Sequence, residues 1–168
     1  MQIIANCDSQ TLEVNNKIYD IAIGKKGYCD ISSKIEGDNK TPLGEYKILS
    51  VWYRLDKIKK LSTLLPLKVI TKSDGWCDDP KSPNYNQHIK LPSNYSHEQL
   101  YKDSDIYDLI LTIDYNTNPI VKNRGSAIFI HIARDKYLPT EGCIALKKTD
   151  LLEIIENLTT NSKILIRP

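Results

Sequence analysis

Short stretches in which apolar and polar residues alternate recur along the chain. This period of two is typical of β-strands, because successive side chains of a strand point to opposite faces of a sheet. Asn15-Asn16 separates two of the stretches and predicts a tight hairpin turn. The predicted strands are Gln2–Ala5, Thr11–Val14, Lys17–Ile23, Glu45–Tyr53, Leu67–Thr71, Ile106–Tyr115, Ala127–Ile132 and Lys163–Ile166.

Helical signals are fewer. Apolar residues follow Thr149 at helical spacing, which predicts an amphipathic helix with Thr149 as its N-cap. Ser96 is expected to cap a shorter helix that ends at Tyr101. Lys72–Asn94 shows no period and is expected to be a long irregular loop. Many short strands and two modest helices predict one mostly β domain, residues 1–168, with peripheral helices.

Composition narrows the functional classes. A formal charge of +2, with no basic run that interleaves with aromatic residues, does not point to nucleic acid. No apolar run approaches the roughly 18 residues that a membrane span requires. The glycines are too few and too scattered for a phosphate-binding loop, and no cofactor motif is present. We therefore expect neither a cofactor nor a nucleic-acid partner.

The candidate chemistry lies in Ser126–Leu146. Alternation along Ala127–Ile132 puts His131 on one face of a strand, and the chain returns through a polar loop to Cys143. Two neighbouring strands joined by this loop would bring the imidazole and the thiol together. A cysteine beside a histidine can form a thiolate near neutral pH, so Cys143 is the candidate nucleophile and His131 the candidate base. The backbone N–H groups of Gly142 and Cys143 are the candidate oxyanion donors.

The other cysteines leave alternatives open. Cys7, Cys29 and Cys77 show neither a C-x-x-C pair nor zinc-site spacing, so they are expected to be core thiols or, in an oxidising compartment, disulfide partners. A metal site built from His131, Cys143, Cys77 and His88 is the weakest alternative, because the ligand spacing is haphazard, and we expect no metal.

Two segments of the chain resemble the signature of the L,D-transpeptidase catalytic domain, the YkuD-like family. His131 matches the upstream histidine of that family, and Thr140-Glu141-Gly142-Cys143 matches its Ser/Thr-His-Gly-Cys turn. Gly37–Tyr46 contains Thr-Pro-Leu-Gly-Glu-Tyr, which is similar to the family's Thr-Pro-x-Gly-x-Tyr/Phe segment. The resemblance covers nearly the whole chain and implies a β-sandwich-like catalytic fold.

The resemblance implies acyl transfer on peptidoglycan stem peptides. The cysteine would attack the carbonyl of an L-centre whose leaving partner is a D-residue, and an amine of a second stem would resolve the thioester into a cross-link. Three other outcomes stay open: an L,D-carboxypeptidase that uses water, another peptidoglycan hydrolase, and a non-catalytic wall-binding domain.

Two positions depart from the family pattern and affect substrate recognition. Glu141 stands where most members carry a second histidine, and Ala145 stands where many carry arginine or asparagine. Arginine forks match carboxylates, so Arg134 and Arg124 are candidate substrate anchors. Thr140, Glu141, Trp76 and Tyr85 complete the predicted substrate-binding set, the last two through a hypothesis that Lys72–Asn94 is a flap walling the cleft.

The expected location is the periplasm or cell envelope, because the implied polymer lies outside the inner membrane. Met1–Asn6, however, has neither the basic nor the long apolar region of a secretory signal. A removed leader, unconventional export, and work on precursors in the cytoplasm all stay open. We expect a monomer.

Overall fold

The computed structural model describes residues 1–168 and is mostly β, as the alternation predicts. The strands are β1 Gln2–Asn6, β2 Thr11–Val14, β3 Lys17–Asp20, β4 Tyr28–Cys29, β5 Thr41–Pro42, β6 Gly44–Tyr53, β7 Leu67–Val69, β8 Asp74–Cys77, β9 His88–Lys90, β10 His97–Gln99, β11 Leu109–Ile113, β12 Phe129–Ile132, β13 Ile144–Leu146 and β14 Lys163–Arg167. The helices are the α-helix α1, Lys148–Glu156, and three 3-10 turns, η1 Ile31–Ser33, η2 Asp105–Tyr107 and η3 Asp135–Tyr137.

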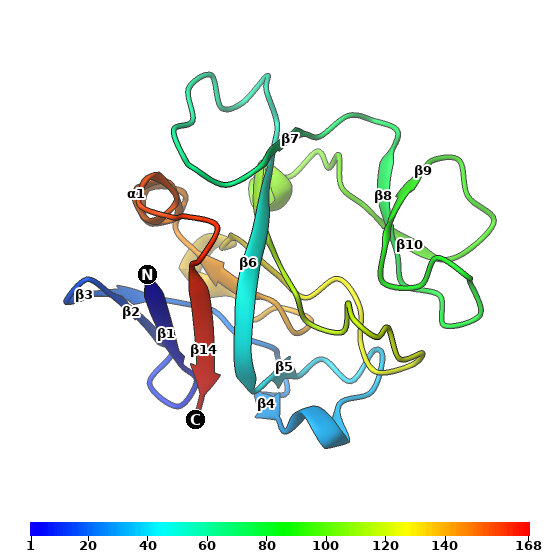
Figure 1. Cartoon of the computed structure of the whole chain (residues 1–168), viewed down its shortest axis with the longest axis horizontal. Helices are drawn as coiled ribbons and strands as arrows, with labels where there is room; N and C mark the ends of the chain where they lie inside the picture. Colours follow the sequence, from blue (N-terminus) through cyan, green and yellow to red (C-terminus); the bar gives the residue numbers. More distant parts are fainter.

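The long strand β6 organises the main sheet and runs through the middle of Figure 1. Its first residues, Gly44–Lys47, pair with β14, and its later residues, Ile48–Tyr53, pair with β11. The strand order is β13-β12-β11-β6-β14-β1-β2-β3, with β7 beside the end of β6. One strand therefore joins a half that carries both termini, on β1 and β14, to a half that carries β12 and β13 (Figure 1).

Burial on both faces of β11 and β12 separates two clusters of apolar side chains. Ile128, Ile130 and Ile132 enter the larger cluster, together with the buried side chains of β1, β2 and β14. Phe129 points to the other face and belongs to a smaller cluster that also contains Cys143. This division is the one that the alternation along Ala127–Ile132 predicts.

The helix α1 covers the larger cluster. Leu151, Ile154 and Ile155 are buried in it, and Leu158 follows after the helix ends. The predicted cap was wrong: the N-cap residue is Lys147, and Thr149 lies in the first turn, where its hydroxyl contacts the Asp150 carboxylate. Burial of the apolar face therefore stabilises this helix without a side-chain cap.

A small sheet of β10, β8 and β9 lies apart from the main sheet, at the right of Figure 1. The helix predicted from Ser96 to Tyr101 is wrong, because His97–Gln99 pairs antiparallel with β8. The expectation of an irregular Lys72–Asn94 is also corrected, since β8 and β9 fall inside it. We refer to β8, β9 and β10 as the small sheet.

Four predicted strands are shorter in the structure, and two of them are Leu67–Thr71, which is reduced to β7, and Ala127–Ile132, which is reduced to β12. β11 begins only at Leu109, because Asp105–Tyr107 forms a 3-10 turn. β3 ends at Asp20, and Ala22 then forms an isolated antiparallel bridge with Ala145. The two-residue turn at Asn15-Asn16 is confirmed, with φ of 50° and 63°, the left-handed values that such hairpins require. No helix is both long and apolar enough to cross a membrane.

The Asp74 carboxylate anchors the small sheet. It is 1% exposed and accepts hydrogen bonds from Lys90 Nζ at 2.5 Å, His88 Nε2 at 2.8 Å and the Thr71 hydroxyl at 2.7 Å. Burial alone would raise the pKa of Asp74, but these donors outweigh it and hold the pKa well below its usual value.

We predict that Asp74→Asn lowers the free energy of unfolding at pH 7 by about 1–3 kcal/mol, because Lys90, His88 and Thr71 lose their charged acceptor. The pKa is lower in the folded state, so this stabilisation is full above the ordinary carboxyl pKa of about 4 and fades as the pH falls below it. Urea denaturation at pH 7 and at pH 3 measures both effects. The exposed Asp103→Asn is the control, and equal losses in the two variants would contradict the anchoring role.

Candidate functional site

His131 is held by its own strand. It lies on β12 with β11 on one side and β13 on the other, and only 7% of the residue is exposed. Its Nδ1 lies 2.9 Å from the carbonyl oxygen of Ile132. A carbonyl only accepts, so Nδ1 carries the proton and the Nε2 lone pair remains available as a base. A backbone carbonyl therefore orients the His131 ring.

Cys143 directly precedes β13, which runs parallel to β12 with Ala145 in register with His131. Its Sγ accepts a hydrogen bond from the Phe129 N–H at 3.3 Å and donates one to the Ala127 carbonyl at 3.2 Å. The strand that carries the histidine therefore also fixes the sulfur, and both side chains line one cavity of about 350 Å³.

Burial sets the charge of both groups. It raises the pKa of the Cys143 thiol to about 12, although the Phe129 N–H works in the opposite direction. It lowers the pKa of His131 to about 4, although the hydrogen bond that Nδ1 donates to the Ile132 carbonyl works in the opposite direction. The expected thiolate–imidazolium pair is therefore corrected: in this structure both groups are neutral at pH 7, because a buried site disfavours the charged form of each.

The Thr140 hydroxyl shapes the turn before Cys143. It accepts a hydrogen bond from the Gly142 N–H at 3.1 Å and donates one to the Cys143 carbonyl at 2.6 Å. The Gly142 N–H, one of the two predicted oxyanion donors, is thus already engaged. The Cys143 N–H makes no hydrogen bond and remains available.

Gly142 is needed for a close approach. Its φ is +131°, and a Cβ at this position would lie 2.8 Å from the carbonyl oxygen of Lys40 and 3.3 Å from Ile128 Cδ1. The segment Lys34–Thr41, which leads into the Thr-Pro-Leu-Gly-Glu-Tyr motif, therefore contacts the turn before Cys143 through its backbone.

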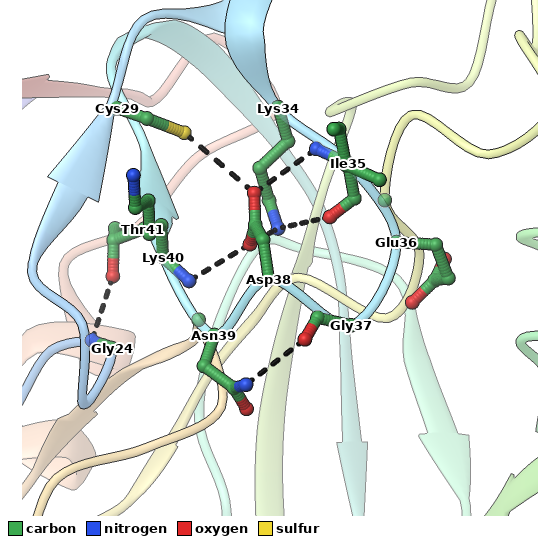
Figure 2. Close-up of polar contacts among 12 residues, drawn as sticks. Gly24, Cys29, Lys34, Ile35, Glu36, Gly37, Asp38, Asn39, Lys40 and Thr41 are labelled. Atoms are coloured by element: carbon green, nitrogen blue, oxygen red, sulfur yellow. Dashed lines mark hydrogen bonds and ion pairs between the residues drawn. The ribbon is translucent and has the colours of Figure 1, made fainter.

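Asp38 is the centre of this segment, and Figure 2 shows its carboxylate between Lys34, Ile35 and Lys40. It accepts hydrogen bonds from Lys34 Nζ at 2.5 Å, the Lys40 N–H at 2.9 Å and the Ile35 N–H at 3.0 Å. Cys29 Sγ approaches the same carboxylate at 4.0 Å. Burial opposes ionisation of Asp38, but the donors prevail and lower its pKa. Lys34 is only 2% exposed, so its ammonium depends on this partner.

Apart from Gly142, five of the predicted site residues line the same cavity: Cys143, His131, Thr140, Glu141 and Arg134. Glu141 is exposed, and its Oε1 lies 3.9 Å from Lys25 Nζ. Arg134 Nη2 donates a hydrogen bond to the Pro139 carbonyl at 2.5 Å. The Arg134 guanidinium forms no ion pair with a carboxylate of the chain.

Three predicted substrate-binding residues lie outside the cavity lining and are corrected. Tyr85 is 0% exposed, and its hydroxyl donates a hydrogen bond to Glu36, which lines the cavity. Tyr85 therefore contacts a residue of the lining without lining the cavity itself. Trp76 packs edge-on against Phe129 with ring centres 5.0 Å apart. Arg124 Nη1 donates to the carbonyl of Ser32 at 2.7 Å and lines a different hollow.

The cavity also contains residues that the sequence did not indicate. They come from three separate parts of the chain: Lys34, Glu36 and Asn39 from the Asp38 segment, Asp78, Glu98 and Lys102 from the small sheet and its flank, and Tyr107 from η2. The Tyr107 ring contacts the His131 ring edge-on at 5.3 Å. Apart from Asn39, which lies within Gly37–Tyr46, no motif marks these positions, although Asp78 lies within the predicted flap.

The metal alternative finds no geometric support. His88 Nε2 contacts Asp74 in the small sheet, and Cys77 is 0% exposed. No group of three or more histidine, cysteine or acidic side chains gathers closely enough to hold a metal ion. All four cysteines are free thiols, so the disulfide alternative does not describe this structure.

Comparison with known families identifies the class. The family model YkuD, described as the L,D-transpeptidase catalytic domain, matches residues 2–166. Because the match covers nearly the whole chain, the chain belongs to this family, and the sequence resemblance is confirmed. No curated protein matches the sequence closely enough to count as a relative.

Several solved structures are similar in fold. An L,D-transpeptidase from Mycobacterium smegmatis is 14% identical over 99% of this chain and 58% of its own, with a TM-score of 0.46. L,D-transpeptidase 1 of Mycobacterium tuberculosis is 13% identical over 99% of this chain and 58% of its own, with a TM-score of 0.47. The helical cell shape determining protein Pgp2 from Campylobacter jejuni is 17% identical over 99% of this chain and 46% of its own, with a TM-score of 0.49. The chain thus spans little more than half the length of the first two.

The rate at which the Cys143 thiol is alkylated tests whether Cys143 and His131 are neutral at pH 7. We predict that alkylation of Cys143 by iodoacetamide is slow at pH 7 and accelerates continuously to pH 9 and above, because the thiolate fraction keeps rising towards a pKa of about 12. Peptide mass spectrometry separates Cys143 from the other thiols. His131→Gln should leave the profile nearly unchanged, since the imidazole is already neutral above about pH 4. A plateau between pH 5 and 8 that this variant abolishes would show an ion pair instead.

Substitution of Gly142 tests the contact between the two motifs. We predict that Gly142→Ala lowers the free energy of unfolding by about 1–3 kcal/mol more than Gly37→Ala does. Both glycines have positive φ, but a Cβ at Gly37 meets nothing within 4 Å, whereas one at Gly142 meets the Lys40 carbonyl. Urea denaturation of the two variants measures the difference. Equal losses would mean that the Lys40 backbone moves aside.

Proposed function

We propose that this protein is a cysteine-dependent acyltransferase of the L,D-transpeptidase type that acts on peptidoglycan stem peptides. One observation carries the proposal: His131, with its Nε2 free, and Cys143 line the same cavity. Family membership supplies the reaction class, and the stem peptides of the cell wall are the proposed donor and acceptor. The proposed place of action is the cell envelope, and the proposed working form is a monomer.

The neutral pair favours general-base catalysis over a preformed thiolate. As the substrate carbonyl approaches, His131 Nε2 takes the thiol proton while Cys143 Sγ forms a bond to the carbonyl carbon. The Cys143 N–H is the available donor for the developing oxyanion, and such a donor is worth about 3 kcal/mol in a transition state. Gly142 contributes its backbone conformation rather than its N–H group.

Collapse of the tetrahedral intermediate completes acylation. The C–N bond to the D-residue breaks, and the imidazolium of His131 returns its proton to the leaving amine, which leaves a thioester on Cys143. The amine of a second stem then attacks the thioester, gives its proton to Nε2, and restores the thiol as a new amide bond forms. Water in place of that amine yields a shortened peptide, so product analysis separates a transpeptidase from a carboxypeptidase.

Charged groups at the rim suit the ends of such substrates. Arg134 has a guanidinium without a carboxylate partner, and it would grip a substrate carboxylate through its planar fork. Glu141 is exposed at the same cavity, where it would attract the amine of an acceptor. Thr140 acts by holding the turn that presents Cys143.

We predict that Cys143→Ala abolishes both covalent labelling by a carbapenem and turnover of stem peptides, and that His131→Gln slows acylation by about 10²–10⁴-fold. Intact-protein mass spectrometry measures the acyl adduct, and chromatography of muropeptides measures the products. Cys7→Ala is the control, because that thiol is buried on the far side of the main sheet from Cys143, in the larger cluster. An unreactive wild-type Cys143 would favour a non-catalytic wall-binding domain.

A further inference from the structure

The connection from β6 to β7, with the residues that flank it, is strongly basic. Residues 54–72 contain five lysines and one arginine against a single acidic residue, Asp56. We call residues 54–72 the basic segment. The whole chain has a formal charge of +2, so the basic segment carries +5 and all other residues together carry −3. Positive charge is therefore concentrated in one part of the chain.

Two buried side chains fix the basic segment to the rest of the molecule. Ile58 and Leu65 belong to the larger cluster. The segment projects beyond the end of β6, at the top of Figure 1. The residues on either side of the two buried ones are exposed, and they are Lys57, Lys59, Leu64 and Pro66. The basic segment is therefore a packed projection whose remaining side chains face solvent.

Large apolar side chains lie exposed among these lysines. Leu64 is 75% exposed and Leu55 is 55% exposed. Leu67 and Val69 are also exposed, on a strand that pairs with β6 alone and has a free outer edge. Aliphatic side chains of this size gain free energy when they leave water. The projection therefore presents apolar surface as well as charge.

The charge of the five lysines is not neutralised within the chain. All five are exposed, and none of them forms an ion pair. The single carboxylate, Asp56, is already bound by Arg54, whose Nε and Nη2 donate to it at 2.8 and 2.7 Å. The lysines are therefore complementary to an anionic partner outside the chain.

We propose that the basic segment docks on a membrane surface that contains anionic phospholipids. The lysine ammonium groups would lie against the lipid phosphates, while Leu55 and Leu64 would enter the boundary between headgroups and acyl chains. A soluble polyanion would leave these leucines in water. A bilayer accepts both kinds of side chain, and a projection can enter it without a preformed groove. No residue of the basic segment lines the cavity, so this docking does not depend on the reaction of Cys143.

Arg54 connects the basic segment to the wall of the cavity. Its Nη1 donates to the Lys102 carbonyl at 2.9 Å, and Lys102 lines the cavity that contains Cys143. The Arg54 guanidinium carbon also lies 3.4 Å from the centre of the Tyr101 ring. Docking through the basic segment would therefore hold the cavity near the membrane surface.

The test is sedimentation of the purified chain with phospholipid vesicles of two compositions. One set contains phosphatidylcholine alone, and in the other about 30% of the lipid is phosphatidylglycerol, which supplies the negative surface potential. Wild type should bind the anionic vesicles at least about tenfold more tightly, and added salt should weaken this binding by screening. Equal binding to the two compositions would overturn the docking.

Charge reversal locates the contact. Each lysine near an anionic surface contributes roughly a factor of five to binding, so a triple reversal should weaken it by about 100-fold or more. This variant combines Lys57→Glu, Lys59→Glu and Lys60→Glu.

The matched control makes the same change in net charge outside the basic segment, at three exposed lysines without ion pairs: Lys26→Glu, Lys81→Glu and Lys136→Glu. At about 0.15 M salt the control should stay within about fivefold of wild type, because charges far from the contact are screened. Equal losses in the two triple variants would overturn the assignment to the basic segment.

A leucine variant separates the membrane from other anionic partners. Leu64→Ser should weaken binding to the anionic vesicles by about tenfold, because less apolar surface leaves water. Its Tm should equal that of wild type, since Leu64 is exposed in the free protein. If Leu64→Ser binds as tightly as wild type, and soluble heparin competes equally with both, the basic segment binds polyanions through charge alone and the proposed membrane docking is overturned.

Discussion

The candidate site depends on the bonds that the Asp38 carboxylate makes within Lys34–Thr41. A loop of this kind lacks the regular backbone hydrogen bonds of a helix or sheet. Its conformation is therefore fixed where side chains hydrogen-bond to its backbone groups instead. Asp38 does this by accepting from two backbone N–H groups and from the buried Lys34 ammonium. The Lys40 carbonyl is thereby placed so close to Gly142 that no side chain fits between them. The two sequence motifs are one structural unit for this reason.

The same close packing explains the charge state of the site. Cys143 and His131 are both largely shielded from water, and such an environment favours a neutral thiol and a neutral imidazole. A neutral thiol is a poor nucleophile, so the proposed reaction requires proton transfer from Cys143 to His131 Nε2 at the moment of attack. The hydrogen bond from Nδ1 to the Ile132 carbonyl makes this transfer feasible, because it fixes the required tautomer.

The sequence predicts the parts of the molecule that local patterns determine. Alternation identified β12 and its two faces, and the order of the motifs identified the residues that lie together at the cavity. It did not identify β8 to β10, because strands of three or four residues with Asp74 and Gly75 among them have no readable period, and tertiary pairing decides their conformation. Burial is likewise a property of the whole fold. For that reason the ionic state of Cys143 and the enclosed position of Tyr85 were both predicted wrongly.

The departure from the family pattern at Ala145 follows from packing. Ala145 exchanges two backbone hydrogen bonds with Ala22, at 2.8 and 2.9 Å, and is 1% exposed. A long cationic side chain has no room or solvent there without displacing the segment that follows β3. In the proposed reaction a carboxylate anchor would then come from outside β12 and β13, and Arg134, in the loop after β12, forms no ion pair within the chain. Under the proposed function, the strands hold the reacting groups, whereas the loops and the small sheet carry the charged side chains of the cavity lining.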